Sequence, residues 1–169
     1  MSTNSLITDE MRAAVGRELG RTTSYPVAAS DIRRWALAVY HPEPPPRRFW
    51  DGGPDDDVVA PEEFNPFAWM TADPPGPPVH GSWGPTIEAR LGLAEVQLAH
   101  MLNGGVETTY GTLMRPGDVI TSTTTLDDYR ERTGRLGPML ITRTRSVWRT
   151  AGDDHVKTTV NTLIRYGTA

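Results

Sequence analysis

Residues 102–128 read LNGGVETTYGTLMRPGDVITSTTTLDD, and this stretch decides the fold. Two runs rich in Thr, Val, Ile and Tyr, 106–113 and 119–126, lie on either side of residues 114–118. β-Branched and aromatic residues favour strands. The Pro116–Gly117 pair favours a turn, because Pro fixes φ and Gly accepts positive φ. The stretch therefore predicts two strands joined as a β-hairpin or a tight strand-to-strand corner, with a sheet as the scaffold.

Two further strands are predicted after this stretch. Residues 140–150 place Ile141 and Val147 among Thr and Arg, and residues 155–166 alternate between two faces. A polar connection at 130–138 and a turn at 151–154 separate these runs. The C-terminal half is therefore expected to form one antiparallel sheet.

Helical patterns precede the sheet. One short helix is expected to start at Thr8 and stop at Gly20, and a second, over 30–41, to end before Pro42, which cannot continue a helix. The second helix has apolar residues at i, i+3, i+4 and i+7, namely Ile32, Trp35, Ala36 and Val39. We expect this helix to lie on the sheet, which gives an α+β fold.

Residues 42–85 hold most of the prolines together with several large aromatic rings. A solvated linker would not need such rings, so we interpret the segment as an ordered, irregular insertion over the sheet. It is expected to contain one short helical turn near 62–70. Residues 86–99 could form a helix or a strand. Residues 1–169 are thus predicted to be a single domain with an insertion at about 42–85.

Composition excludes several classes of function. The net charge of −4, with no large Lys/Arg cluster, gives no support for nucleic-acid binding. The chain has no Cys, and no His pair has metal-ligand spacing, so neither thiol chemistry nor a metal is indicated. No signal peptide and no run of 18 apolar residues is present, so we expect no membrane partner and a cytoplasmic location.

Four segments together resemble the MaoC-like dehydratase/hydratase family. They are WALAVYHPEP at 35–44, VVAPEEF at 58–64, LNGG at 102–105 and RPGDV at 115–119. The similarity is closest to the N-terminal, fatty-acid-synthase-type dehydratase half of the family and covers about 15–165. It implies a hot-dog fold, in which a curved antiparallel sheet wraps around a helix, and side-by-side pairing of two such units. It also implies hydration of an enoyl-CoA or acyl-carrier enoyl thioester, or the reverse dehydration, without a cofactor.

The resemblance fails at the family's acid–base pair. Active members carry an Asp, and a His five residues later, in a pattern like Gly-Asp-x-Asn-Pro-x-His just after the first helix. This chain has VYHPEPPP at 39–46, with His41 at the Asp position, Glu43 at the Asn position and proline at or near the His position. Both groups that would transfer protons are therefore expected to be absent.

The leading hypothesis is a subunit that supplies the substrate-binding half of an enoyl-CoA hydratase or dehydratase. A second MaoC-like subunit would supply the Asp/His dyad in a heterodimer or heterotetramer, and the acyl group would be bulky, for example steroid-like or polyketide-like. The residues expected to contact substrate are Phe64, Asn65, Phe67 and Trp69 as an apolar wall. Asn103, Gly104 and Gly105 are also expected to contact substrate, and the pair Gly104–Gly105 predicts a β-bulge or a place where a neighbouring backbone or ligand comes close.

Two alternatives stay open. The chain could be a self-sufficient homodimeric hydratase or dehydratase with a rearranged site, using His41 or His80 with Glu43 or Asp51. It could also be a non-enzymatic hot-dog protein that binds an acyl thioester without turnover.

Overall fold

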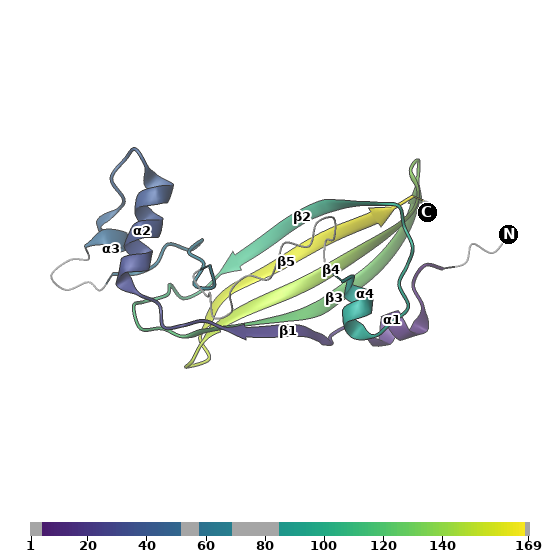
Figure 1. Ribbon diagram of the computed structural model, residues 1–169, viewed down its shortest axis with the longest axis horizontal. Coiled ribbons are helices and arrows are strands. Elements are labelled where there is room, and N and C mark those ends of the chain that lie inside the picture. The colour runs from purple at the N-terminus through teal and green to yellow at the C-terminus, as the bar shows by residue number, and fades with distance from the viewer. Residues whose placement is uncertain (1–4, 52–57, 69–84, 168–169) are drawn as a thin grey trace, which may run out of the picture.

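The computed structural model describes residues 5–51, 58–68 and 85–167 as one long, curved antiparallel sheet with short helices at its two ends (Figure 1). The sheet has five strands in the order β1-β3-β4-β5-β2. In chain order the elements are α1 (Asp9–Ala13), β1 (Glu18–Thr23), α2 (Ala29–Tyr40), α3 (Arg47–Trp50), α4 (Ile87–Leu91), β2 (His100–Tyr110), β3 (Ile120–Gly134), β4 (Gly137–Thr150) and β5 (His155–Tyr166).

The predicted hairpin between the two arms of the opening stretch is wrong. β2 pairs with β5 at one side of the sheet, whereas β3 pairs with β1 and β4, so β4 and β5 separate the two arms. The predicted turn does form, since the Arg115 N–H donates to Asp118 Oδ2 at 2.7 Å and Gly117 has φ of 94°. The nine residues from 111 to 119 exceed the length of an ordinary hairpin loop and cross the end of the sheet instead.

The strands are longer than the sequence predicts. β3 continues to Gly134 and pairs with β4 as far as Gly137, so the expected connection at 130–138 shrinks to a turn at 135–136. β2 already begins at His100, and β1 was not predicted at all. Charged residues hid β1 and the extension of β3, because an exposed strand carries polar side chains on its outward face without losing its backbone pairing.

The first helix is shorter than expected. Thr8 caps it, accepting the Met11 N–H at 3.2 Å, but α1 ends at Ala13, and Gly16 turns the chain with φ of 88°. Leu19 belongs to β1 rather than to the helix. Residues 86–99 divide into α4 and an irregular segment that leads into β2.

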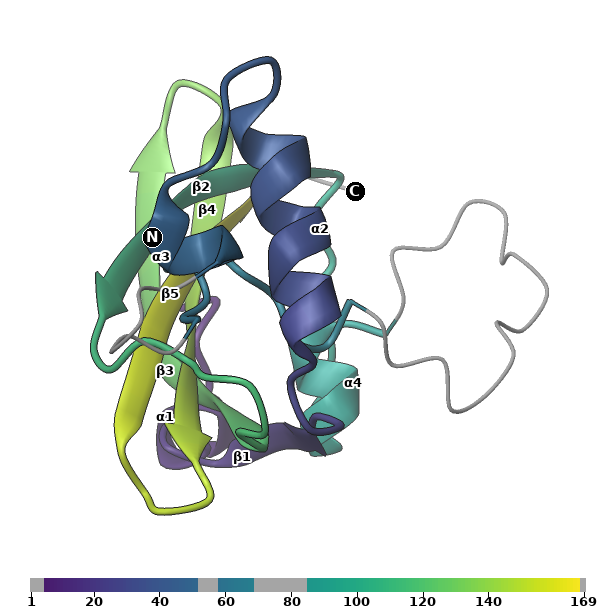
Figure 2. The ribbon, with the colours of Figure 1, turned by 90° about the vertical axis from the view of Figure 1, so that its left-hand side faces the viewer.

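The second helix forms as predicted but covers only one end of the sheet. Its Ile32 is fully buried against Ile120 and Val156, which lie at the starts of β3 and β5. Val39, expected on the buried face, is 56% exposed. Figure 2 shows α2 standing beside the sheet with α3 packed against it.

The apolar core is divided between the two ends of the sheet. Around α2 the main cluster consists of Val27, Ile32, Val58, Ala60, Phe64, Met114, Ile120 and Val156, and a smaller one between α2 and α3 consists of Ala36, Phe49 and Val59. Around α1 and α4 they are Ile7, Met11, Ala14, Leu91, Leu126, Tyr129 and Leu140. Between them the central strands carry hydroxyls, with Thr124 and Ser146 hydrogen-bonded across β3 and β4 at 2.7 Å.

The insertion is ordered where the structure describes it. Residues 58–64 pack into the core around α2, and the Ala60 N–H donates to the Met114 carbonyl at 2.8 Å. α3 was not predicted, and the described part of the expected helical turn, 62–68, forms turns instead. Across residues 5–51, 58–68 and 85–167, no helix is long and apolar enough to span a membrane.

Candidate active site

The segment that follows α2 does not assemble an acid–base pair in this chain. His41 terminates the helix and Glu43 follows in a turn, its N–H bonded to the Tyr40 carbonyl at 2.8 Å. Both side chains are exposed, and no hydrogen bond or ion pair joins them to each other or to another described residue. Asp51 pairs instead with Arg47 at 3.5 Å. The rearranged pair stays a prediction, and His80 lies outside the described residues.

The predicted aromatic wall is in part core. Phe64 is 1% exposed and meets Trp35 edge to face, whereas Phe67 is half-buried and meets Trp148 edge to face at 5.0 Å. The exposed Asn65 accepts the Phe67 N–H at 3.0 Å, which shapes the turn. Trp69 falls outside the described residues. Phe67 is therefore the described ring of this wall that keeps part of its surface exposed.

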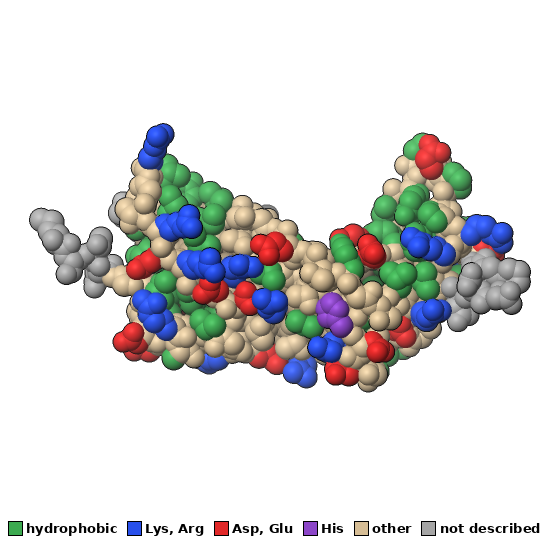
Figure 3. Space-filling view, turned by 180° about the vertical axis from the view of Figure 1, so that it is seen from behind, with side chains coloured by type: hydrophobic (Ala, Val, Ile, Leu, Met, Phe, Trp, Pro, Cys, Tyr) green, Lys and Arg blue, Asp and Glu red, His purple; other side chains and the backbone are tan. Residues whose placement is uncertain are grey.

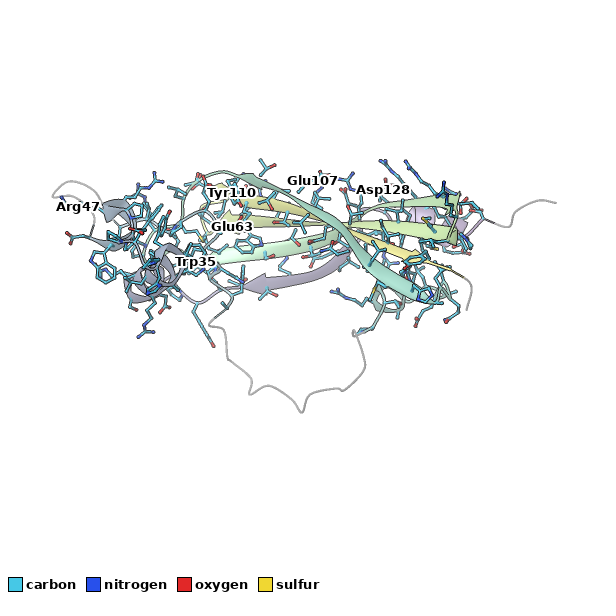
Figure 4. All side chains as sticks on the ribbon, turned by 90° about the horizontal axis from the view of Figure 1, so that it is seen from above. Trp35, Arg47, Glu63, Glu107, Tyr110 and Asp128 are labelled. Atoms are coloured by element: carbon cyan, nitrogen blue, oxygen red, sulfur yellow. The ribbon has the colours of Figure 1, made fainter. Side chains whose placement is uncertain are left out.

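Beside this wall a buried lysine anchors the segment to β5. Lys157 bonds Glu63 at 3.0 Å and lies over the rings of Tyr110 and Trp148 at 5.5 and 4.9 Å. Figure 4 shows Glu63 and Tyr110 together at the α2 end of the sheet. Attraction to the aromatic faces and the carboxylate offsets the cost of burying the ammonium group.

The prediction of a β-bulge at Gly104–Gly105 is confirmed. The pairing of β2 with β5 shifts between Asn103 and Gly105, whose N–H donates to Asn103 Oδ1 at 2.9 Å and whose φ is 120°. A side chain at Gly104 would lie 2.8 Å from Thr162. The glycines are thus explained by the bulge and by close packing, and their contact with substrate stays a prediction.

A cavity of about 930 Å³ lies at the other end of the sheet, between α4, residues 95–99, and the adjoining ends of β2 and β5. Its apolar lining includes Ile87, Val96, Leu98, Met101, Leu163 and Tyr166, and its polar members are Thr86, Glu95, Gln97, His100, Asn103 and Arg165. This volume is near the upper limit for small-molecule pockets, about 300–1,000 Å³. Figure 1 places the cavity's elements, α4 and the start of β2, at the end of the sheet opposite α2.

A buried ionic network supports one wall of this cavity. Thr86 caps α4 by accepting the Ala89 N–H, and the helix holds Glu88, which is fully buried. Glu88 Oε1 accepts from Arg165 at 2.7 Å and from the Tyr129 hydroxyl at 2.9 Å. Burial, and then the Glu88 carboxylate, raise the pKa of Tyr129 far above its ordinary value, although Arg165 opposes the shift.

Sequence reasoning missed this network. Glu88 lies in a stretch that fits both helix and strand, and Arg165 lies on an alternating strand whose two faces both carry polar residues. The signal that could have indicated the network was an acidic residue, Glu88, among the apolar residues of 87–93. Its partner, Arg165, is 77 positions away in the sequence, so no local pattern connects the two. Over the described ranges, no three His, Asp or Glu residues are grouped so that they could hold a metal ion.

The fold and the family are defined by comparison with known proteins. A curved five-stranded antiparallel sheet with few helices is the hot-dog architecture of MaoC-like dehydratases. The family described as FAS1-like, dehydratase domain region, matches residues 13–159. The chain therefore belongs to the MaoC-like hydratase/dehydratase family, in its FAS1-like dehydratase region. No functionally curated protein matches the sequence.

Three solved structures illustrate the shared fold. A chain of the ChsH1–ChsH2 complex from Mycobacterium tuberculosis is 18% identical, with a TM-score of 0.55 and coverage of 89% of this chain and 91% of that one. The MaoC-like dehydratase from Rhodospirillum rubrum is 19% identical, with a TM-score of 0.51 and coverage of 92% and 94%. The (R)-hydratase from A. caviae involved in PHA biosynthesis is 11% identical, with a TM-score of 0.53 and coverage of 92% and 96%.

Proposed function

We propose that this chain is the substrate-binding subunit of a heteromeric enoyl-CoA hydratase or dehydratase, located in the cytoplasm. A second MaoC-like subunit supplies the Asp and His that move protons. The observation that carries the proposal is the pairing of a large cavity with a post-helix segment that lacks the Asp/His dyad. A site with room for an acyl group in a chain that lacks the family's Asp/His dyad needs that dyad from elsewhere.

The direction of β2 supports a shared site. β2 runs from the cavity end of the sheet at His100 to the α2 end at Tyr110 (Figure 1). If two such edges pair antiparallel about a twofold axis, the start of one β2 lies beside the end of the other. The cavity of this chain then faces the post-helix segment of its partner, where the family carries the dyad.

The outer edge of β2 is suited to such pairing. All of its eleven residues except Thr108 and Tyr110 are exposed, and among the strands of the described ranges β2 pairs with β5 alone. Met101, Leu102 and Val106 on this strand are 40%, 40% and 54% exposed. A long edge strand with exposed apolar side chains is a site for association with another strand.

The surface on this side has a shape that would receive a partner. Figure 3 shows a hollow along the β2 side, between the α2–α3 end and the β3–β4 turn, with hydrophobic side chains on both raised parts. Leu37 in α2 and Leu136 in the β3–β4 turn are 46% and 57% exposed. The ChsH1–ChsH2 complex, an assembly of two differently named chains, supports a heteromer as one use of this fold.

The test is reconstitution of activity. The chain is co-expressed with a MaoC-like protein that carries the intact Asp/His spacing and is encoded nearby, and hydration of enoyl-CoA substrates is followed by loss of enoyl absorbance. The proposal predicts activity only in the complex, and loss of that activity when the partner's Asp or His is replaced by Ala. Full activity of this chain alone would overturn it.

A matched pair of variants tests the interface. Val106→Asp adds a charge to the β2 edge, and Val15→Asp adds the same charge to a residue of similar exposure, 42%, outside β2. Size-exclusion chromatography with light scattering should show separated subunits for Val106→Asp and an intact complex for Val15→Asp. Dissociation by both variants, or by neither, would contradict the assigned edge.

The same assay separates the two alternatives. Activity of the chain alone that is lost on replacing His41, Glu43, Asp51 or His80 by Ala would establish the rearranged homodimeric site. Binding of an acyl thioester without turnover in any subunit combination would indicate a non-enzymatic protein.

A further inference from the structure

The sheet has a face that the helices α2 and α4 do not cover. Figure 2 shows both helices on one side of the sheet. Leu140 of β4 points to this side, since it belongs to the core around α1 and α4. Met139 and Ile141 precede and follow it, and successive residues of a strand point to opposite faces. These two side chains therefore lie on the other side of the sheet, which we call the outer face.

Strand register arranges the cavity end of the outer face in two rows across four strands. The first row consists of directly paired residues of β3, β4, β5 and β2, namely Arg132, Met139, Tyr166 and His100. The second row, two residues nearer the middle of each strand, consists of Arg130, Ile141, Ile164 and Leu102. Directly paired residues share a face, and the rings of His100 and Tyr166 accordingly lie 5.2 Å apart.

The apolar side chains of these rows belong to no core cluster of the described residues. Leu102 is 40% exposed, and Met139, Ile141, Ile164 and Tyr166 are half-buried. None of these five packs against the clusters around α2 or against the cluster around α1 and α4. Adjoining apolar side chains that stay accessible on a surface mark an interaction site.

Two arginines beside the apolar side chains have no counter-charge. Arg132, at the end of the first row, and Arg135, in the β3–β4 turn, are exposed and make no ion pair or hydrogen bond with a described residue. The acidic residues of this part of β3 are engaged, since Asp128 pairs with Arg130 at 2.7 Å and Glu131 binds the N-terminal segment at 2.7 Å. Figure 3 shows Lys and Arg side chains beside hydrophobic ones on and below the raised turn.

The charges of this surface select the chemistry of a partner. The unpaired cations lie at the β3 end of the rows, and at the opposite end the segment that leads into His100 carries Glu95. A second copy packed through the same rows would bring arginine, histidine and apolar side chains, but no carboxylate for Arg132. The net charge of −4 disfavours a polyanion such as nucleic acid or an anionic membrane. The surface fits a protein with an apolar stripe and carboxylates at one end of it.

The dimensions select the form of this partner. Four adjacent strands span about 14 Å between the outermost two, which is the length of about nine helical residues. We propose that the two rows bind an acidic amphipathic helix of another protein, which lies across the four strands. Its apolar stripe packs on the rows, and its carboxylates bind Arg132 and Arg135. His100, Leu102 and Tyr166 also line the cavity, so the helix borders it. The proposal goes beyond the proposed function and does not require it.

Binding of three matched peptides to the full chain tests the proposal. The first is an amphipathic helix about 18 residues long, with Leu at i, i+3, i+4 and i+7 and with Glu and Ala elsewhere, since shorter helices are marginal in water. The second has Lys in place of every Glu, and the third has the composition of the first in scrambled order. Dissociation constants are measured by fluorescence anisotropy of the labelled peptides. We expect the first peptide to bind about tenfold more tightly than either of the others.

Matched variants connect this binding to the two rows. Arg132→Glu and Arg135→Glu should each weaken binding of the acidic peptide about fivefold, whereas Arg17→Glu, at an exposed arginine outside the rows, should leave it unchanged. Leu102→Asp should weaken the same binding about tenfold. Val39→Asp is its control, because Val39 is 56% exposed and lies on α2. All five side chains are exposed, so the variants should fold, which circular dichroism verifies.

Several outcomes would overturn the proposal. They are equal affinity for the acidic and basic peptides, equal affinity for the scrambled peptide, absence of binding, and binding that Arg132→Glu and Leu102→Asp leave unchanged. Phosphatidylglycerol vesicles serve as a further probe. If the chain binds these vesicles through Arg132 and does not bind the acidic peptide, the surface takes a membrane and the proposal is wrong. None of these results depends on hydration activity, which the reconstituted complex tests separately.

Discussion

The buried pair of Glu88 and Arg165 gives the sharpest test of the structure. Replacing Glu88 by Leu removes both hydrogen bonds to Oε1, at 2.7 and 2.9 Å, and leaves the guanidinium with 9% exposure and no counter-charge. Removal of one partner from a buried ion pair costs about 3–5 kcal/mol of unfolding free energy. At about 2–4 °C per kcal/mol for a chain of this length, the melting temperature should fall by about 6–20 °C.

The assay is urea and thermal unfolding followed by circular dichroism. Glu62→Leu is the matched control, because Glu62 is exposed and its replacement should change the unfolding free energy by less than about 0.5 kcal/mol. The double variant Glu88→Leu/Arg165→Met should recover most of the loss, since apolar residues of similar volume replace a buried pair at little cost. A loss below about 1 kcal/mol in Glu88→Leu, or losses that simply add in the double variant, would refute the assigned burial and pairing.

Three further predictions concern other parts of the sheet. Gly111→Ala should lower the unfolding free energy by about 1–3 kcal/mol in urea titrations. The new Cβ would overlap the carbonyl oxygen of His155 and lie 2.5 Å from the Nδ1 atom of the same residue. Unchanged stability would refute that contact. Because the pKa of Tyr129 is raised in the folded state, its ionisation favours unfolding, so its contribution to stability is retained below about pH 10 and falls above it. The urea midpoint of Tyr129→Phe should therefore decline less than that of the unmodified chain above pH 10, and parallel declines would refute the shift. Lys157→Met should change the unfolding free energy by less than about 1.5 kcal/mol. Met can pack between the rings of Tyr110 and Trp148, and the Glu63 side chain, which is 59% exposed, is then solvated by water. A larger loss of unfolding free energy in the same titration would refute this prediction.

Local chemistry made much of the fold predictable. The Thr- and Val-rich runs form strands, the turn of Pro116 and Gly117 forms where expected, and the bulge at 103–105 follows from the paired glycines. These features depend on neighbours in sequence, such as the φ angle that Gly117 adopts at 94°. The family resemblance added the hot-dog fold, which is confirmed.

Pairing over long distances could not be predicted in the same way. A Pro-Gly turn fixes the direction of the chain locally, but it does not decide whether β2 meets β3 or β5, because both strands offer Thr-rich edges. One wall of the cavity depends on the ion pair between Glu88 and Arg165, which are 77 positions apart in the sequence. The residues around neither of them indicate which partner it binds. For the segment at 39–46 the sequence itself was informative, because it shows directly that the family's Asp and His are replaced. The positions of the described side chains add little to that conclusion.

The division of the core between two ends of the sheet also bears on how this molecule unfolds. The main apolar cluster around α2 and the cluster around α1 and α4 share no residue, and strands that carry hydroxyl side chains connect them. Because local opening follows contiguous packed units, we expect the strand ends under each cluster to open as a separate unit. Hydrogen exchange should then show the end that carries α2 and the end that carries the cavity opening with different free energies. Docking of a second subunit along β2 would bridge both units and make them unfold together.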